Sequence, residues 1–323
     1  MKTVFLDFDT VSHDDVSADA LRLPGIELVL HGVTPPSALD ERIADAAIVI
    51  TNKMRLDAGM LASAADLRLV CVAATGTNNV DVEAARRLAI GVCNIERYCT
   101  ASVVQHVFAV ILTLTHHLRA YQRLLQQGAW RSSPQFCLLD FPIRELSGKT
   151  IGIVGFGELG SAVARVAEAF GMRVLVAQRP GNASPGADDS EPDRTPLQRL
   201  LAEADVVSLH CPLTDQTHGM IGVAELQLMK SDALLINTAR GALVDSSALA
   251  EALASGQIGG AGIDVLPEEP PLHGDPLLDA ALPNLVVTPH IAWAAREARQ
   301  RAVDEIAANI RDFLAGGRRG RVD

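Results

Sequence analysis

The chain has 323 residues, of which 48% are hydrophobic and only 4% aromatic, and its formal net charge is −11. The length predicts two domains, and cores made of Ala, Val, Leu and Ile favour parallel sheets covered by helices over antiparallel sandwiches. The acidic balance argues against a nucleic-acid partner, which would favour a basic face.

The cysteines are odd in number and form no CxxC pair; they stand at positions 71, 93, 99, 137 and 211. This pattern predicts free thiols and a reducing, cytoplasmic setting. We find no recognisable metal-ligand spacing and expect no metal. The first apolar run contains Asp7, which is typical of a strand and not of a signal peptide. The most apolar helical segment is too short and too interrupted to span a bilayer, so we expect no membrane partner.

Two series of alternating β and α patterns follow each other along the chain. In the first series we expect strands at 3–8, 26–32, 46–51, 67–74 and 89–95. In the second series we expect strands at 150–155, 172–177, 205–211, 233–239, 260–266 and 284–290. The sequence thus predicts an α/β protein with two Rossmann-like or flavodoxin-like parallel-sheet domains. The second domain, 101–290, is inserted into the first, which comprises 1–100 and 291–323.

The remaining segments join or flank these series. One long helix is expected over 101–127, and an irregular apolar arm follows at 130–146. An amphipathic helix over 292–316 should pack on the N-terminal unit through Ala302, Val303, Ile306 and Ile310. The polar stretch 181–196 is expected to be a surface loop, and the basic tail 316–323 a solvated end.

The segment "TIGIVGFGELG" (150–160) places Gly155, Gly157 and Gly160 between an expected strand and a helical pattern. Dinucleotide binding requires this context. Gly155 permits the tight turn, Gly157 lets the backbone approach a pyrophosphate, and Gly160 allows close helix–strand packing. The phosphates would lie at the helix N-terminus, where N–H groups point outward. Residues 101–290 are therefore expected to be the dinucleotide-binding domain.

The next strand of this series ends in "VLVAQRPG", with Gln178 where an acid would hold the ribose hydroxyls of NAD. Gln178 can still donate to and accept from a hydroxyl. Without the carboxylate nothing repels a 2′-phosphate, and Arg179 could pair with one. The sequence therefore leaves NAD, NADP or both open as the coenzyme.

Three further strand ends each offer an ionisable side chain, where ligands collect in parallel sheets: Arg240, Glu268 or Glu269, and His290. The segments ATGTNNVD, GFGELG, HCPLT, NTARGALVD, AGIDVLPEEPP and TPHIAW resemble the D-isomer-specific 2-hydroxyacid dehydrogenase family, in the family's order and over almost the whole chain. "FCLLDFPIREL" and "HIAWAAREARQR" are most similar to its bacterial glycerate dehydrogenase, or hydroxypyruvate reductase, branch.

The resemblance implies a catalytic set of Arg240, Glu269 and His290 in a substrate site with Thr75 and Gly76. A guanidinium suits the carboxylate of a 2-keto acid, and the amides of Thr75 and Gly76 would hold its other side. His290 would protonate the ketone oxygen as hydride arrives from the nicotinamide. Glu269 would fix the tautomer of His290. Residues 1–100 and 291–323 would then form the substrate-binding domain.

The resemblance also implies the coenzyme contacts and the assembly. The expected contacts are Thr75, Gly155, Gly157, Glu158, Leu159, Gly160, Gln178, Arg179, Cys211, Thr238, Ala239, Asp264 and His290. Asp264 would hold the nicotinamide amide. A two-fold homodimer through 101–146 is expected, with the arm reaching toward the partner's active cleft.

The implied reaction is the NAD(P)-dependent interconversion of a 2-keto acid and a D-2-hydroxy acid, with hydroxypyruvate or glyoxylate forming D-glycerate or glycolate. D-Lactate, 3-phosphoglycerate and bulkier acids stay open as substrates of other members. A binding protein of the NAD-sensing corepressor kind is the alternative from another class. Formate oxidation is disfavoured, because that branch replaces the glutamate that Glu269 provides here.

Overall fold

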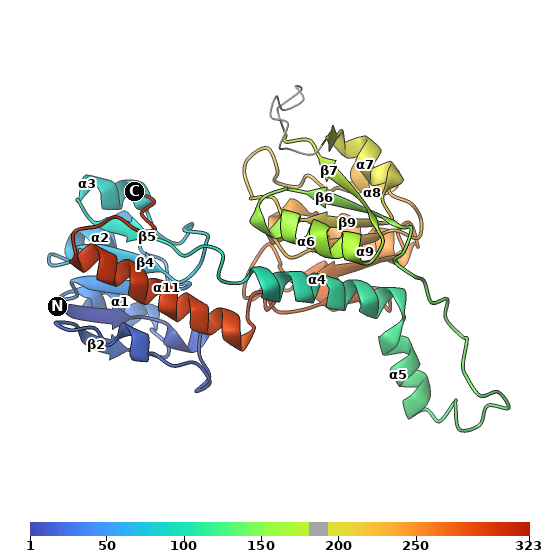
Figure 1. The fold of residues 1–323 in the computed structure, drawn as a ribbon, viewed down its shortest axis with the longest axis horizontal. Coiled ribbons are helices and arrows are strands. Elements are labelled where there is room, and N and C mark those ends of the chain that lie inside the picture. The colour runs from blue at the N-terminus through green and yellow to red at the C-terminus, as the bar shows by residue number, and fades with distance from the viewer. Residues whose placement is uncertain (181–192) are drawn as a thin grey trace. The chain divides into compact units, whose positions relative to one another are not determined.

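A computed structural model describes residues 1–180 and 193–323, in which the chain forms two compact units (Figure 1). Unit 1 comprises Met1–Cys99 and Trp293–Asp323, and unit 2 comprises Thr100–Ala292. Each unit is built on one parallel sheet. This arrangement confirms the expected α/β class, with one parallel-sheet domain inserted into another.

Unit 1 has a five-stranded sheet in the order β2-β1-β3-β4-β5. Its central strands read IVIT and LVCV and are buried along their whole length, as expected of parallel strands covered on both faces. The strands are β1 (Lys2–Phe5), β2 (Glu27–Leu30), β3 (Ile48–Thr51), β4 (Leu69–Val72) and β5 (Gly91–Cys93). The helices are α1 (Leu39–Ile43), α2 (Ala58–Ser63), α3 (Val82–Arg87) and α11 (Arg296–Leu314), with 3-10 turns η1 (Phe8–Thr10), η2 (Asp19–Leu21) and η3 (Pro36–Ala38).

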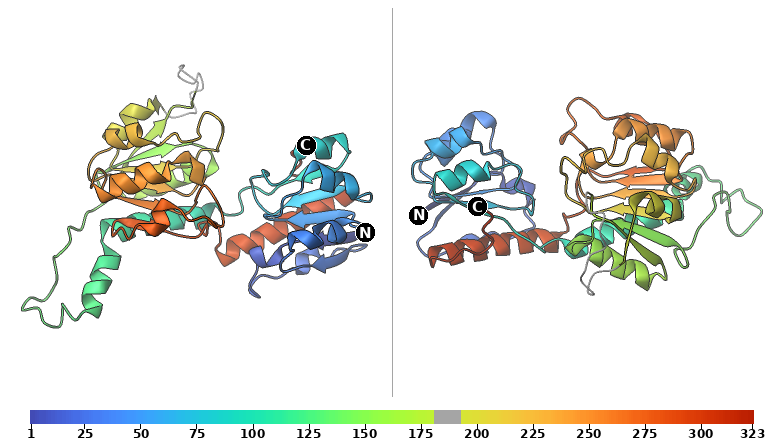
Figure 2. Two further views of the ribbon diagram at one scale, coloured as in Figure 1. Left: turned by 180° about the vertical axis from the view of Figure 1, so that it is seen from behind. Right: turned by 90° about the horizontal axis from the view of Figure 1, so that it is seen from above.

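Helices lie on both faces of the unit 1 sheet (Figure 2). Alternate side chains of its strands pack against one helical layer or the other. Val4 and Val70 pack with α1, α2 and α3 on one face. Phe5 and Leu69 pack with α11 on the other. The apolar stripe predicted for this terminal helix is buried there, through Ala302, Val303, Ile306 and Ile310.

Unit 2 has a seven-stranded sheet in the order β12-β11-β10-β9-β6-β7-β8. Helices α7, α8 and α9 contact one another in sequence, whereas α4 contacts α6 and β11. The strands are β6 (Thr150–Val154), β7 (Arg173–Ala177), β8 (Arg194–Thr195), β9 (Val206–Leu209), β10 (Leu234–Asn237), β11 (Gly260–Ile263) and β12 (Leu285–Val287). The helices are α4 (Thr100–Thr115), α5 (Leu118–Gln126), α6 (Glu158–Ala169), α7 (Leu197–Glu203), α8 (Val223–Leu228), α9 (Ser246–Ala254) and α10 (Pro276–Asp279), with the 3-10 turn η4 (Gly241–Leu243).

The edge strand β8 was not predicted. It pairs with β7 through Val176 and Ala177 and lies inside the stretch 181–196 that was expected to be a surface loop. Residues 181–192 of that stretch lie outside the described residues. The prediction is wrong for the two residues of β8, because tertiary pairing with a neighbouring strand overrides weak local propensity.

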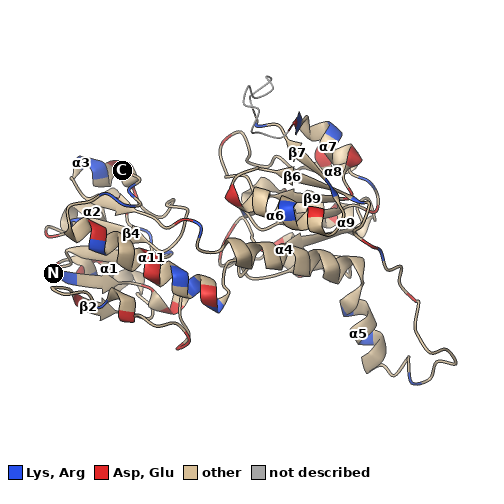
Figure 3. Cartoon of the chain, viewed as in Figure 1, with Lys and Arg blue, Asp and Glu red and all other residues tan. Residues whose placement is uncertain are grey.

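The long helix predicted over 101–127 consists of two helices, α4 and α5, with a 57° bend between them. The break falls at His117, whose φ of 50° is left-handed and ends the first helix. Helix α4 carries no charged residue, whereas α11 carries both signs (Figure 3). Among the described residues, no single helix has the length and apolarity to cross a membrane; only this bent pair passes when its two helices are combined.

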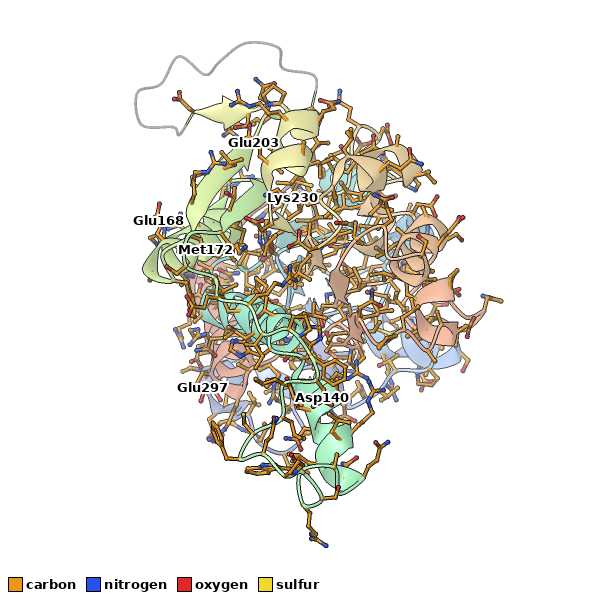
Figure 4. All side chains as sticks on the ribbon, turned by 90° about the vertical axis from the view of Figure 1, so that its right-hand side faces the viewer. Asp140, Glu168, Met172, Glu203, Lys230 and Glu297 are labelled. Atoms are coloured by element: carbon orange, nitrogen blue, oxygen red, sulfur yellow. The ribbon has the colours of Figure 1, made fainter. Side chains whose placement is uncertain are left out.

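The apolar arm after α5 extends away from the sheet of unit 2 (Figure 1; Asp140 is labelled in Figure 4). Tyr121 donates from its hydroxyl to the carbonyl of Phe141 at 2.9 Å, which ties one end of the arm to α5. Four large apolar side chains elsewhere in the arm are exposed: Trp130 by 53%, Phe136 by 91%, Leu139 by 77% and Ile143 by 52%.

The basic tail, predicted to be solvated, instead covers the free edge of β5. Val322 donates its N–H to the carbonyl of Val92 at 2.9 Å, and Val92 donates to the Asp323 carboxylate at 2.9 Å. The Arg321 guanidinium pairs with that carboxylate and holds the pKa of Asp323 at about 2. The prediction is wrong for residues 321–323, which satisfy open backbone groups of an edge strand, whereas Arg318 and Arg319 are exposed as expected.

Candidate active site

The glycine turn after β6 has the geometry that dinucleotide binding requires. Gly155 adopts a φ of +96°, and a β-carbon on it would collide with the backbone of His210 and Cys211. A β-carbon on Gly160 would collide with the Gly155 carbonyl, whereas Gly157 faces open space. Helix α6 begins directly after Gly157, so its first N–H groups have no partner within the helix. The turn therefore combines close packing with an open approach to a helix N-terminus.

A pocket of about 410 Å³ lies beside this turn, at the carboxyl ends of β6, β7 and β9. The strand order reverses between β6 and β9, which is where open α/β sheets bind their ligands. Five of the predicted coenzyme contacts line the pocket: Gly155, Gly157, Gln178, Arg179 and Cys211. Residues that the sequence reasoning did not assign to it also line it, among them Phe156, Arg194, His210, Thr214, Thr217 and Met220.

Arg194 reaches the pocket from β8, where its guanidinium donates to the carbonyl of Ala177 at 3.2 Å. No local signal marks it, because its position depends on β8 returning beside β7. A signal did exist for His210, which follows β9 in the HCPLT segment.

Two buried polar atoms near the strand ends have no hydrogen-bond partner among the described residues: His210 Nδ1 and Thr238 Oγ1. The other ring nitrogen of His210 lies 2.9 Å from Ser208 Oγ, and burial lowers the pKa of His210 to about 4. Buried polar atoms normally have a partner. The orphaned atoms and the glycine turn therefore fit a polar dinucleotide ligand at this edge of the sheet.

The loops after β11 and β12 bring an imidazole and a carboxylate into contact. His290 Nδ1 lies 2.7 Å from Glu269 Oε2, and Glu269 Oε1 accepts from the Leu266 N–H at 2.9 Å. The structure thus pairs Glu269 with His290, whereas the adjacent Glu268 lies 2.9 Å from His273. Because Nδ1–H donates to the carboxylate, Nε2 of His290 is the nitrogen left to exchange a proton.

The backbone of His290 is held in an unusual conformation, with a φ of 53°. Its N–H donates to the carbonyls of Asp264 at 2.7 Å and Thr288 at 3.0 Å. The buried Asp264 carboxylate accepts from the N–H groups of Ile291 and Ala292, each at 2.9 Å. A left-handed residue other than glycine persists only where its surroundings fix it. Asp264 fixes His290 through two groups: its carbonyl binds the N–H of His290, and its carboxylate binds the N–H groups of the next two residues.

Arg240 lies on the turn after β10 and is positioned by Asn237. The Asn237 side chain donates to the Arg240 carbonyl at 2.8 Å and accepts from the Ala239 N–H at 3.0 Å. The Arg240 guanidinium donates to the Ala239 carbonyl at 2.7 Å. A β-carbon on Gly241 would overlap the backbone of Leu266 and Pro267. The turn that carries Arg240 therefore packs directly on the segment that leads to Glu269.

The predicted residues of unit 1 lie on the loop after β4. The Asn94 side chain donates to the carbonyl of Thr75 at 2.7 Å, and the Thr75 hydroxyl donates to Ile95 at 3.0 Å. Within the part of the chain that the structure describes, no protein group accepts from the N–H of Thr75 or Gly76. Two fixed and unpaired amides of this kind suit an anionic ligand.

Comparison with known proteins adds four matches. Residues 108–292 match the family model described as "D-isomer specific 2-hydroxyacid dehydrogenase, NAD binding domain". A glycerate dehydrogenase from Methylorubrum extorquens is 42% identical over 317 residues, covering 98% of this chain and 96% of that protein. A hydroxypyruvate reductase from Blautia hydrogenotrophica is 37% identical over 319 residues, covering 98% of each. The crystal structure of the TT0316 protein from Thermus thermophilus is 36% identical and superposes with a TM-score of 0.87 over all of both chains.

Proposed function

The chain belongs to the D-isomer specific 2-hydroxyacid dehydrogenase family, and we propose that it reduces hydroxypyruvate and glyoxylate to D-glycerate and glycolate. It is an NAD-dependent oxidoreductase that interconverts a 2-keto acid and a 2-hydroxy acid. The observation that carries the proposed chemistry is the bonded pair of His290 and Glu269, held in the same unit as the glycine turn.

We assign the proton transfer to His290 and the binding of the substrate carboxylate to Arg240. Reduced NAD, when bound, supplies the hydride to the carbonyl carbon. His290 Nε2 donates a proton to the ketone oxygen, and Glu269 stabilises the imidazolium through Nδ1. General-acid help of this kind contributes about 10²- to 10⁴-fold in rate. The planar guanidinium of Arg240 pairs with the substrate carboxylate and polarises its carbonyl.

We assign dinucleotide binding to residues 101–290 and substrate binding to residues 1–100 and 291–323. The glycine turn supports the first assignment. The free amides of Thr75 and Gly76 support the second, because they offer donors to a carboxylate. We propose that Asp264, directly after β11, contacts the nicotinamide amide.

We further propose that the chain uses NADPH as well as NADH. Gln178 stands directly after β7 where a carboxylate would repel a 2′-phosphate, and Arg179 and Arg194 line the pocket beside it. Two guanidinium groups would bind a 2′-phosphate, whereas a carboxylate would repel it. The measurement is kcat/KM for the two coenzymes, which we expect to agree within about tenfold. A preference for NADH of more than about a thousandfold would contradict this proposal.

We propose a two-fold homodimer through residues 101–146, with the arm reaching toward the partner's active cleft. Trp130, Phe136 and Leu139 expose between 53% and 91% of their surface in a single chain. Large apolar side chains exposed to this extent favour an interaction site. Sedimentation at micromolar concentration should give a dimer, and a monomer would exclude the proposal.

The setting that we propose is the cytoplasm, with neither nucleic acid nor a membrane as partner. The five cysteines are free thiols in the structure, which suits a reducing compartment. The net charge of −11 opposes binding to nucleic acids and to anionic membrane surfaces.

The test of the proposed function is a steady-state panel of hydroxypyruvate, glyoxylate, pyruvate and phenylpyruvate with each coenzyme. Hydroxypyruvate should give the highest kcat/KM, by about tenfold or more over pyruvate. A higher value for pyruvate or phenylpyruvate would replace the proposed substrate. NADH binding without turnover of any keto acid would identify a binding protein instead.

A further inference from the structure

Helix α4 turns two polar side chains, Ser102 and His106, toward the loop that carries His290. They are four residues apart and so lie on one face of the helix. Ser102 Oγ donates to the Ala292 carbonyl at 2.7 Å, and His106 Nε2 lies 3.1 Å from Thr288 Oγ1. The mechanism proposed above uses neither side chain.

Close packing of α4 on the sheet makes these contacts possible. A β-carbon on Gly262 of β11 would collide with Val110, one helical turn beyond His106. The missing side chain at Gly262 thus lets α4 approach β11. The His106 side chain is 17% exposed, and the Asp264 carboxylate near it only 1%.

The direction of the hydrogen bonds follows from the chemistry of the groups. Asp264 receives donors at both carboxylate oxygens, including Thr288 Oγ1 at 2.6 Å. The only proton of the Thr288 hydroxyl therefore points to Asp264, and its oxygen is left to accept. His106 must be the donor, so its Nε2 carries a proton.

We infer that His106 is a positioning residue for the proton donor, acting through a relay of His106, Thr288 and Asp264. This inference rests on the role proposed for His290. His106 fixes the Thr288 hydroxyl, Thr288 fixes the Asp264 carboxylate, and Asp264 fixes the backbone on both sides of His290. Without the His106 donor, the Thr288 hydroxyl is free to turn away from Asp264, which loosens the loop. Small misplacements of a reacting group cost much in rate.

The test compares His106→Leu, which lacks a donor, with His106→Gln, whose amide N–H takes the place of Nε2–H. Gln227→Leu, at an exposed position on helix α8 outside the proposed dimer interface, is the control. With full-length enzyme, hydroxypyruvate and NADH, His106→Leu should lower kcat about tenfold and leave KM within about twofold. His106→Gln should recover kcat to within about threefold of the wild type, and Gln227→Leu should leave it unchanged. A kcat for His106→Leu within about twofold of the wild type, or equal losses in both His106 variants, would overturn the relay.

If His106→Leu does not fold, a second pair of variants at Thr288 tests the same relay. Thr288→Ser keeps the hydroxyl and should keep kcat, whereas Thr288→Val should lose as much as His106→Leu. The double variant of His106→Leu and Thr288→Val should be no slower than Thr288→Val alone, because both changes break one relay. Additive losses would contradict it.

A readout without turnover separates this inference from the proposed function. The ¹⁵N resonances of the His290 ring report its bond to Glu269 directly. These resonances should shift in His106→Leu and lie at their wild-type positions in His106→Gln. Wild-type positions in both variants would reject the relay. A wild-type enzyme that turned over no keto acid would reject the proposed function but leave this measurement intact.

Discussion

Two imidazole–carboxylate pairs lie in unit 2 on sequence-adjacent glutamates, and they differ in their surroundings. His290 is 2.7 Å from Glu269 and His273 is 2.9 Å from Glu268. The His273 side chain is 85% exposed, whereas that of His290 is 28% exposed and its backbone is fixed by Asp264. The short distance between ring and carboxylate is therefore shared by both pairs and does not by itself distinguish the proposed proton donor, His290. The hydrogen bonds that surround the pair set it apart.

Removing each imidazole in turn should give the largest difference in kcat between the two pairs. His290→Ala should lower kcat about 10²- to 10⁴-fold, because the proton donor is lost. Binding of NADH, followed by its fluorescence, should survive. His273→Ala should leave kcat unchanged. Comparable losses in the two variants would erase the distinction.

Replacing the glutamate of each pair should have the second largest effect on kcat. Glu269→Gln removes the charge that favours the imidazolium of His290, and we expect kcat to fall about 10- to 100-fold. Glu268→Gln is the control and should leave kcat unchanged. A kcat for Glu269→Gln within about twofold of the wild type would show that Glu269 does not support the proposed proton donor.

Backbone packing should have a smaller effect. Gly241→Ala places a β-carbon against Leu266 and Pro267 and pushes the Arg240 turn away from the Glu269 segment. We expect kcat/KM to fall about tenfold, since positioning errors weaken transition-state binding. Gly222→Ala meets only ordinary contacts, such as Glu225 at 3.6 Å, and should behave as wild type. Equal kcat/KM in the two variants would show that the close approach at Gly241 is unimportant.

A third imidazole, His210, contacts a hydroxyl where the other two contact a carboxylate, and it should show the smallest effect. Burial lowers its pKa from 6.5 to about 4, so the folded state binds fewer protons than the unfolded state between these values. Its contribution to stability is complete above pH 6.5 and is lost as the pH falls toward 4. From pH 7 to pH 5 the wild type should lose about 2 kcal/mol more unfolding free energy than His210→Asn. Urea unfolding at both pH values measures the difference, and parallel losses would contradict the assignment.

Prediction from sequence succeeded where the signal is local. The alternation of apolar runs and helical segments gave both parallel sheets, and the spacing around Gly155, Gly157 and Gly160 gave the dinucleotide turn. It failed at His117, where a single left-handed residue divides a helix that reads as continuous. It also failed at residues 321–323 of the tail, which is polar in sequence but satisfies an edge strand in space.

The candidate site also shows this difference between local signals and long-range contacts. Glu269 and His290 were identified by motif, yet their bond and the separate pairing of Glu268 with His273 required the structure. Arg194, in the pocket beside the glycine turn, and His106, behind the proposed proton donor, were not predicted from the sequence. Neither has a neighbour in the chain that marks its role.

The sequence by itself determined which residue types stand at the strand ends, because short-range periodicity and turn chemistry are written into consecutive residues. Only the tertiary structure decided which of those side chains meet and which backbone groups hold them. The reason is physical: a contact such as that of His106 with Thr288 joins residues 182 positions apart. Its geometry depends on how a helix packs on a sheet, and no local pattern encodes that.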